Sequence, residues 1–340
     1  MLLGPMAPTF PSEVRIRPAP RLSIVIPVFN EEEVLPILLE RLRALLARLE
    51  CEVEVVFVDD GSRDRTADII AQAHAGDPRF KLIQFSRNFG HPAAITAGMD
   101  HATGDAVVLM DADLQDPPEL IVDMVARYRE GYDVVQAQRA SRKKDTLFKR
   151  ASAAGFYRLM GLLTHQQMQD NVGEFRLMSR NVVDAIAGMR EHHRLIRGMV
   201  SWVGFRHTTV TFERPARSAG ETKYPLSKMI RLSVDGVTSF STAPLRIASL
   251  LGILSLMAGF AYSAYALYMR FVRQVTVQGW TSLVIINIFF SSIVLLCLGV
   301  VGEYVGRIFE EVKNRPLYLV SRKLDGASAA SSEPVANRGR

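Results

Sequence analysis

The chain has 340 residues, of which 48% are hydrophobic and 22% charged, as is typical of a globular protein that also carries membrane segments. Its two cysteines, Cys51 and Cys297, exclude a disulfide framework and favour a reducing compartment. Lysine and arginine outnumber aspartate and glutamate by 41 to 35, but the sequence has no zinc-ligand spacing and no basic stretch rich in aromatic residues, so we expect no nucleic-acid binding.

Residues 1–20 contain Pro5 and Pro8 and lack a long apolar core, so we expect a flexible tail and not a signal peptide. Further along, apolar runs alternate with segments of helical periodicity. Strands are predicted at 22–29, 53–58, 81–85, from Ala106 and at 133–137, and helices at 34–49, 66–75, 92–99 and 117–130. This order predicts an α/β domain with a mainly parallel, doubly wound sheet covered on both faces.

Acidic residues follow three of these strands. Glu31 comes after the first strand, Asp59-Asp60 ends the second, and Asp111 and Asp113 follow the fourth. Parallel strands end at the same edge of a sheet, and open α/β sheets bind their ligands at that edge. The three clusters therefore indicate one site for a nucleotide and a metal.

The sequence DADLQ carries the strongest metal signal. Its two aspartates repel each other unless a cation joins them, and their carboxylates with the amide oxygen of Gln115 are the hard ligands that Mg²⁺ or Mn²⁺ prefers. The alternative is an aspartate turn that caps the next helix. That alternative explains Asp116 as the N-cap before Pro117-Pro118-Glu119, but it leaves Asp111 and Asp113 without a role.

Beyond Arg139 the alternation stops and a strongly basic run begins, for which a solvated surface is the alternative to a binding role. Residues 146–163 and 227–243 each combine an apolar face with basic residues. This pattern is typical of helices that lie on a membrane surface, and it fits ordinary core helices as well.

Two stretches, 247–269 and 280–302, contain no charged side chain and are long enough to cross a bilayer. Basic residues flank the pair more densely than they occupy the loop between them, so the positive-inside rule places both flanks in the cytoplasm. We therefore expect a cytoplasmic domain over residues 21–226, two transmembrane helices, and a cytoplasmic segment with a disordered tail over 303–340.

The sequence lacks GxxxxGK[ST], GxGxxG, GxSxG and HExxH motifs, which removes the main support for several other enzyme classes. Over residues 21–320 it resembles the polyisoprenyl-phosphate glycosyltransferases of glycosyltransferase family 2, through IVIPVFNEE, VDDGSRDRT, DADLQDPPE, the arginines at 139 and 142, VGEFRLMSR, RGMVSWVGFR and GETKYPLSKM. The resemblance implies a GT-A fold and metal-dependent, inverting transfer of a hexose from a nucleotide-sugar, with UDP-glucose favoured. The implied acceptor is undecaprenyl phosphate or a similar lipid, which would become a sugar donor for cell-envelope glycans. It further implies an active site on the cytoplasmic membrane face and a homotetramer.

The resemblance also assigns roles to individual residues. The nucleotide-sugar residues are Pro27, Asn30, Glu31, Asp59, Asp60, Asp111 and Arg139. The metal ligands are Asp113 and Gln115, with Asp111 beside them, and the lipid-phosphate residues are Arg142, Arg217 and Lys223. A flexible basic loop is the alternative for the last two. The catalytic set is Asp113, Glu174, Arg142 and Lys223.

Glu174 departs from the family pattern, because related sequences often have aspartate at this position. The resemblance implies that this acid steers the acceptor or the donor sugar, and Asp170 and Asn171 are alternatives for the role. A lipid phosphate monoester is largely ionised, with a second pKa of about 6, so it needs no strong general base to attack the anomeric carbon.

Two other functions compete with this interpretation. A processive polysaccharide synthase shares the acidic strand-end motifs, but such enzymes resemble one another in a QxxRW segment and additional spans, which this sequence lacks. The second is a membrane-anchored scaffold with an inactive transferase domain. The presence of Asp111, Asp113 and Gln115 argues against that alternative.

Overall fold

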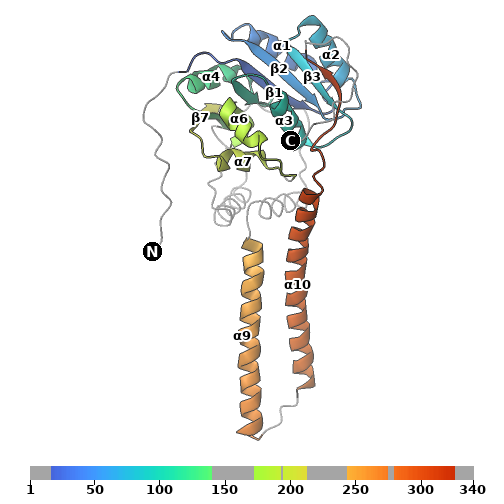
Figure 1. Ribbon diagram of the computed structural model, residues 1–340, viewed down its shortest axis with the longest axis vertical. Helices are drawn as coiled ribbons and strands as arrows, with labels where there is room; N and C mark the ends of the chain where they lie inside the picture. Colours follow the sequence, from blue (N-terminus) through green and yellow to red (C-terminus); the bar gives the residue numbers. More distant parts are fainter. Residues whose placement is uncertain (1–16, 140–171, 193, 213–242, 275–278, 326–340) are drawn as a thin grey trace. The chain divides into compact units, whose positions relative to one another are not determined.

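The computed structural model describes residues 17–139, 172–192, 194–212, 243–274 and 279–325. These residues belong to two compact units: one contains the eight described strands and the shorter helices, and the other contains the two long helices α9 and α10 (Figure 1). The predicted surface helix at 146–163, and nearly all of the one at 227–243, lie outside the described residues.

The first unit is built around an eight-stranded sheet with the order β7-β5-β6-β4-β1-β2-β3-β8. The strands are β1 Leu22–Val28, β2 Val53–Asp59, β3 Phe80–Phe85, β4 Ala106–Leu109, β5 Val134–Arg139, β6 Val172–Ser179, β7 His207–Phe212 and β8 Val320–Leu324. Only β6 and β8 run antiparallel to their described neighbours. The predicted mainly parallel sheet is confirmed, and β6, β7 and β8 are additional to the predicted strands.

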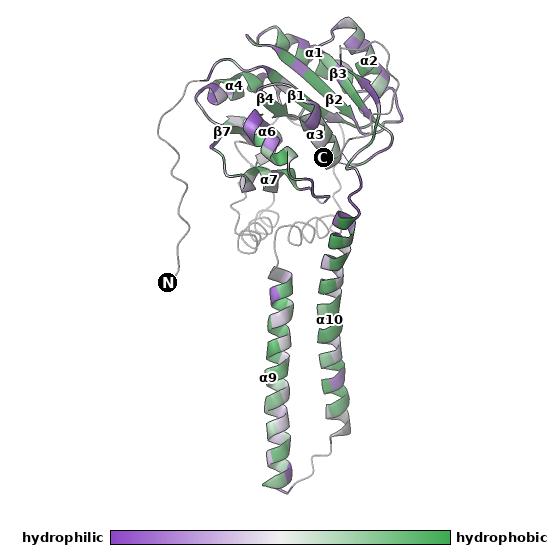
Figure 2. Ribbon diagram, viewed as in Figure 1, coloured by the Kyte–Doolittle hydropathy of each residue, from purple (hydrophilic) through white to green (hydrophobic). Residues whose placement is uncertain are grey.

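Helices cover both faces of this sheet, which explains why every residue of β1, β2 and β4 is buried (Figures 1 and 2). One core contains side chains of α1, α2 and α4, and the other contains side chains of α3, α6 and α7. The bounds are α1 Leu35–Leu46, α2 Thr66–Gly76, α3 His91–His101, α4 Ile121–Arg129, α6 Arg180–Ala187 and α7 Ile196–Trp202.

The helix predicted at 117–130 is divided into a 3₁₀ turn, Pro118–Leu120, and α4. The N-cap of the turn is Pro117, and no side chain caps it. The prediction that Asp116 is the N-cap is therefore wrong. The backbone reason is that Pro117 is extended, with ψ of 116°, so helical geometry begins one residue later.

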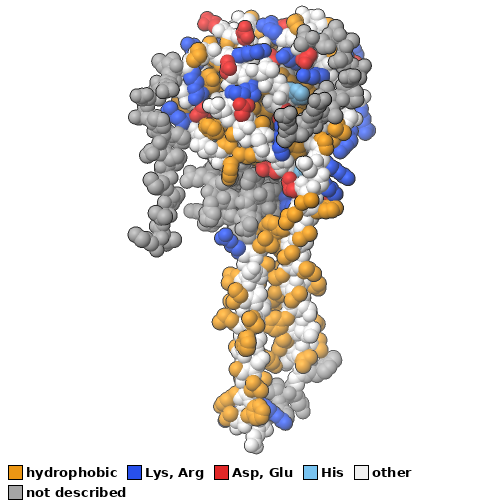
Figure 3. All heavy atoms as spheres, in the orientation of Figure 1, with side chains coloured by type: hydrophobic (Ala, Val, Ile, Leu, Met, Phe, Trp, Pro, Cys, Tyr) orange, Lys and Arg blue, Asp and Glu red, His pale blue; other side chains and the backbone are white. Residues whose placement is uncertain are grey.

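The second unit consists of α9, Ala243–Phe271, and α10, Trp280–Val312, with exposed apolar side chains along both helices (Figure 3). Each helix is long and apolar enough to cross a membrane. The predicted spans fall inside these helices, but α10 continues past residue 302 to Val312. The continuation mixes apolar residues with four charged ones, and Arg307 pairs with Glu303 one turn away, so the search for an uncharged stretch ended before it.

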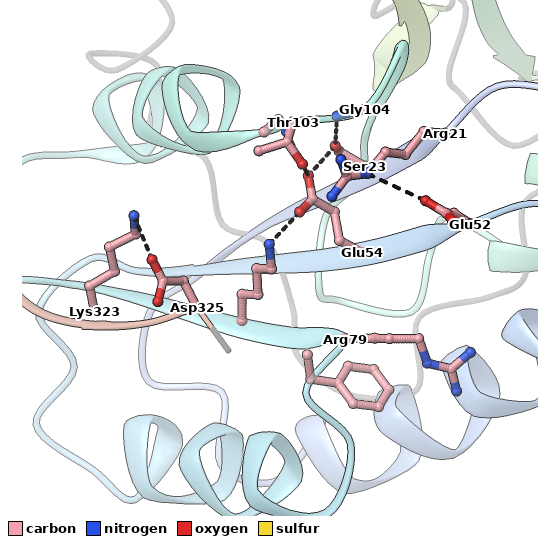
Figure 4. Close-up of polar contacts among 12 residues, drawn as sticks. Arg21, Ser23, Glu52, Glu54, Arg79, Thr103, Gly104, Lys323 and Asp325 are labelled. Carbon is pink, nitrogen blue, oxygen red and sulfur yellow. Dashed lines mark hydrogen bonds and ion pairs between the residues drawn. The ribbon is translucent and has the colours of Figure 1, made fainter. Parts of the chain in front are cut away.

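A buried carboxylate joins three elements at the edge of the sheet opposite the acidic strand ends (Figure 4). Glu54 in β2 accepts hydrogen bonds from the hydroxyl of Ser23 (2.5 Å), the N–H of Thr103 (2.6 Å) and the ammonium of Lys81 (2.6 Å). Burial raises the pKa of Glu54, but these hydrogen bonds outweigh it and lower the pKa to about 2. Glu54 is therefore an ionised structural residue.

Replacing Glu54 with alanine should lower the melting temperature of the full chain in detergent by about 10 °C, because Lys81 loses its buried partner. The matched variant Glu52→Ala should change it by less than about 2 °C, since that side chain is 86% exposed. Because the pKa of Glu54 is lower in the folded state, its ionised carboxylate stabilises the fold at any pH above the unfolded-state pKa. This stabilisation is lost as the pH falls towards 2 and the carboxylate becomes protonated. A difference between wild type and Glu54→Ala that persists unchanged at pH 2 to 3 would contradict this assignment.

Candidate active site

The loops after β1 and β2 are joined by hydrogen bonds into one structure. The backbone N–H of Asn30 donates to Ser62 Oγ (2.9 Å), and Asn30 Oδ1 accepts from the N–H of Arg63 (2.9 Å). The N–H of Glu31 donates to the Thr66 hydroxyl (2.8 Å). Asn30 has a φ of 54°, a region that asparagine adopts more readily than most residues. The two predicted donor-site residues, Asn30 and Glu31, are thus held beside the end of β2.

Pro27 and Asp59 lie where β1 and β2 reach this edge. β4 ends at Leu109, before the level of Pro27, so the missing N–H of the proline breaks no ladder hydrogen bond with β4. Asp59 is buried and accepts hydrogen bonds from the N–H of Ser62 (3.0 Å) and the side-chain amide of Gln84 in β3 (3.0 Å). The carboxylate of Asp59 therefore binds the chain itself.

The neighbouring Asp60 binds a different loop. Its carboxylate accepts hydrogen bonds from the backbone N–H groups of Phe89 (2.7 Å) and Gly90 (3.0 Å), directly before α3. Burial raises the pKa of Asp60 against the opposing effect of these two hydrogen bonds. Asp60 thus fixes the segment of residues 86–91, which we name the α3 entry loop, against the end of β2.

The DADLQ segment turns sharply after β4. Leu114 has a φ of 59°, unusual for a branched apolar residue, and Asp113 Oδ1 accepts a hydrogen bond from the N–H of Gln115 (3.1 Å). Glu31 lies close enough to Asp113 for its pKa to be raised, first by burial and then by the negative charge of Asp113. The structure therefore brings the end of β1 and the DADLQ turn to one place, as the sequence predicted.

The side chain of Gln115 has a buried oxygen that is available to bind a metal ion. Its side chain is 3% exposed, and Oε1 has no hydrogen-bond partner among the described residues, although a buried amide oxygen normally has one. In the part of the chain that the structure describes, no three histidine, cysteine or acidic side chains form a metal cluster. Mg²⁺ commonly takes only one or two protein carboxylates and completes its shell with water and substrate phosphates. Asp113 with Gln115 fits that type of site.

A second charged cluster lies at the same edge, because β6 runs antiparallel to β4 and its amino end reaches the carboxyl end of β4. His91 Nε2 lies 3.1 Å from Asp111 Oδ1. The carboxylate of Glu174 accepts hydrogen bonds from Arg176 Nη2 (3.1 Å) and from Arg197 Nε of α7 (2.6 Å). Glu174 and Asp111 both affect the pKa of His91 by their charge, so the three side chains share one electrostatic environment.

Arg176 is buried beneath this cluster and fixes the position of Glu174 through its hydrogen bonds. It is 1% exposed, and its guanidinium donates to the carbonyl oxygens of Gly173 (2.8 Å) and Glu174 (3.1 Å) as well as to the Glu174 carboxylate. Burial lowers the pKa of Arg176, which nevertheless stays charged because arginine titrates so high. Arg176 Nη1 and Oε1 of Gln136, opposite it in β5, have no partners among the described residues.

The remaining predicted site residues have a mixed outcome. Arg139 is the last residue of β5, at the same end of the sheet. Arg142, Arg217 and Lys223, together with the alternatives Asp170 and Asn171, lie outside the described residues. His91, Arg176 and Arg197 were not among the predicted site residues. The available signal for His91 was its place before Pro92, at a helix start that follows a strand end.

The His91 and Asp111 pair predicts a measurable pH effect. The hydrogen bond to Asp111 raises the pKa of His91 against the effect of burial, so the pair stabilises the fold at low pH and loses that contribution as the pH rises through the raised value. Both side chains are partly exposed, so His91→Gln should cost less than about 1 kcal/mol at pH 6 and almost nothing at pH 9.

The matched variant His101→Gln should show the opposite trend in melting temperature, because burial lowers the pKa of His101. Wild type should lose stability relative to His101→Gln as the pH falls from 8 to about 5. Parallel pH profiles for the two variants would contradict the pairing of His91 with Asp111.

Comparison with known proteins identifies the class to which this sheet and site belong. Residues 23–187 match the family model of glycosyl transferase family 2. The uncharacterized glycosyltransferase YkcC of Bacillus subtilis (strain 168) is 51% identical over 300 residues, which are 88% of this chain and 93% of that protein. The chain therefore belongs to glycosyl transferase family 2, and its sheet is the GT-A fold of that family.

Relatives with more specific names match over nearly their whole length. The prophage bactoprenol glucosyl transferase homolog of Escherichia coli (strain K12) is 41% identical over 302 residues, 89% of this chain and 99% of that protein. The bactoprenol glucosyl transferase of Shigella phage SfX is 41% identical over 304 residues, 89% of this chain and 100% of that protein. The protein is accordingly a transferase enzyme related to bactoprenol glucosyl transferases.

Proposed function

We propose that this enzyme transfers glucose from UDP-glucose to the phosphate of a polyprenyl phosphate such as undecaprenyl phosphate. The observation that carries the proposal is the 41% identity, over 99% of its length, to a relative named for bactoprenol glucosyl transfer. The acidic edge of the sheet supports it, because the loop with Asn30 and Glu31 and the loop with Asp111 and Asp113 follow the neighbouring strands β1 and β4, where α/β sheets bind ligands.

The chemistry follows from the acceptor. An oxygen of the lipid phosphate attacks the anomeric carbon of the glucose, and the bond from that carbon to the diphosphate oxygen breaks with its electron pair leaving on UDP. Because the phosphate is largely ionised, with a second pKa of about 6, the protein has to position it and need not deprotonate it. Arg142, Arg217 and Lys223 are proposed to bind the lipid phosphate, because guanidinium and ammonium groups bind phosphate oxygens.

Asp113 and Gln115 are proposed to hold Mg²⁺ or Mn²⁺ on the donor diphosphate, with Asp111 beside them. A bound divalent ion supplies neutralisation of the charge that accumulates on the leaving diphosphate. Glu174, oriented by Arg176 and Arg197, is proposed to accept a hydrogen bond from a sugar hydroxyl and so to fix the anomeric carbon.

The membrane arrangement belongs to the same proposal. Helices α9 and α10 would anchor the enzyme in the cytoplasmic membrane, with the catalytic domain over residues 21–226 and both termini in the cytoplasm. Residues 146–163 and 227–243 would lie on the membrane surface, where a polyprenyl phosphate is found. We also propose that the enzyme is a homotetramer.

The test is a transfer assay with the full chain purified in detergent. With radiolabelled UDP-glucose, undecaprenyl phosphate and Mg²⁺ or Mn²⁺, we expect a lipid-soluble product that carries one glucose. GDP-mannose and UDP-galactose serve as competing donors in parallel reactions. A labelled polymer would favour a processive synthase, and the absence of transfer from any donor would favour an inactive scaffold.

A further inference from the structure

The chain that follows α10 returns to the catalytic sheet. Strand β8 pairs antiparallel with β3 and forms the edge of the sheet beyond it. Just before β8, the carbonyl oxygen of Leu319 accepts a hydrogen bond from the N–H of Ser86 (3.0 Å), and Ser321 Oγ donates to the carbonyl oxygen of Gln84 (3.1 Å). The returning segment therefore contacts β3 at the point where β3 passes into the α3 entry loop.

Tyr318 anchors this segment. The side chain is buried and stacks on Phe85, with ring centroids 5.1 Å apart and an angle of 15° between the planes. Its hydroxyl donates to Asp100 Oδ2 at the end of α3 (2.8 Å), and Arg190 binds the same carboxylate through two contacts of 2.8 and 3.0 Å. Burial raises the pKa of Tyr318, so the hydroxyl stays protonated and remains a donor.

The anchor is connected to the donor site through two aromatic contacts. Phe85, on which Tyr318 stacks, meets Phe89 edge to face, with centroids 5.6 Å apart. The N–H of Phe89 is one of the two that Asp60 binds. The α3 entry loop then ends at His91, which contacts Asp111. Tyr318 thus supports both ends of α3, through Asp100 at one end and through the entry loop at the other.

Covering the edge of β3 does not by itself explain this arrangement. Residues Ser321, Arg322 and Lys323 of β8 are exposed, so the strand buries little apolar surface of its own. The buried contact is made by Tyr318, outside the strand, and it is directed at the entry loop and α3. A segment that served only to cap the sheet would not require the second contact to Asp100.

We propose that Tyr318 is a positioning residue for the nucleotide-sugar: docked on Phe85 and Asp100, it holds the α3 entry loop in the position in which Asp60 and His91 complete the donor site. This inference rests on the proposed function for the identity of the donor. In structural terms, the segment after α10 completes, through Tyr318, the site that binds the nucleotide-sugar.

Steady-state kinetics of the full chain in detergent test the functional part. Tyr318→Ala should raise KM for UDP-glucose about tenfold and leave KM for undecaprenyl phosphate within about twofold of wild type. Tyr318→Phe keeps the ring contact and should recover most of the affinity for the donor. The control Arg322→Ala, an exposed change in β8, should match wild type. A purely structural role would lower the yield and the melting temperature without changing KM for the donor.

Hydrogen exchange tests the structural part independently of the substrate. Amides of residues 86–91 should exchange at least about tenfold faster in Tyr318→Ala, while those of β1 and β2 keep their wild-type rates. Tyr318→Leu, which retains apolar bulk, replaces the alanine variant if that variant does not fold. Unchanged exchange in the entry loop overturns the proposal, and so does faster exchange with an unchanged donor KM. If wild type does not use UDP-glucose, the proposed function fails, and the exchange rates alone decide on Tyr318.

Discussion

Replacing Asp113 with asparagine should reduce glucose transfer from UDP-glucose about a thousandfold. The asparagine keeps an oxygen that can accept the hydrogen bond from the N–H of Gln115, so the DADLQ turn should persist. It removes the negative charge that would hold Mg²⁺ or Mn²⁺ on the diphosphate, and such an ion contributes several kcal/mol to stabilising the leaving group. The measurement is kcat/KM for the donor with saturating lipid phosphate.

A second measurement on Asp113→Asn does not depend on turnover. Mn²⁺ added together with UDP should raise the melting temperature of wild type and not that of the variant, because a ligand that binds the native state stabilises it. Asp123→Ala, an exposed change in α4, serves as the control and should behave like wild type. Chelation with EDTA should abolish transfer and added Mg²⁺ or Mn²⁺ should restore it. Transfer that resists chelation, or full activity in Asp113→Asn, would refute the assignment of the metal.

Glu174→Gln should lower kcat about a hundredfold. The glutamine has the same size but lacks the charge that binds Arg176 and Arg197, so the side chain would lose its fixed orientation at the site. A misplacement of the substrate by about 1 Å can cost about a hundredfold in rate, which sets the size of the expected effect. The measurement is kcat at saturating UDP-glucose and lipid phosphate.

The control for Glu174→Gln is the same substitution at Glu130, which pairs with Arg127 on the surface of the domain. Glu130→Gln should leave kcat unchanged. Glu174→Asp restores the charge on a shorter side chain and should recover part of the activity, with a changed preference among UDP-sugars if the carboxylate meets the sugar. A folded Glu174→Gln variant with the wild-type kcat would show that this carboxylate has only a structural role.

The central strands of the sheet could be predicted because their burial on both faces is visible in the sequence as short apolar runs. Strands β1 and β4 are uncharged apolar runs, and β2 is apolar apart from Glu54 and its last residue, Asp59, as expected of strands covered on both faces. Strand β6 was missed because Glu174 and Arg176 interrupt its apolar pattern, and their mutual ion pair, which makes their burial tolerable, is not visible in a sequence. Strand β8 was missed because an edge strand has exposed charged residues, as Arg322 and Lys323 show.

The candidate site could be predicted only in part. The carboxyl ends of parallel strands meet at one edge, so Glu31 and Asp113 were expected together, and they follow the neighbouring parallel strands β1 and β4. The sequence did not reveal that Asp59 and Asp60 bind loops of the chain itself. It also did not place Glu174 near His91, because that requires knowing that β6 inserts antiparallel beside β4.

The return of the chain to the sheet has a consequence for biosynthesis. Among the described strands, β8 is made last, after both apolar helices, whereas β1 to β4 emerge early and can begin to fold as they appear. If Tyr318 completes the donor site, a nascent enzyme gains full affinity for its nucleotide-sugar only once α9 and α10 have been translated. Incompletely synthesised chains would then consume little donor before an acceptor lipid is within reach.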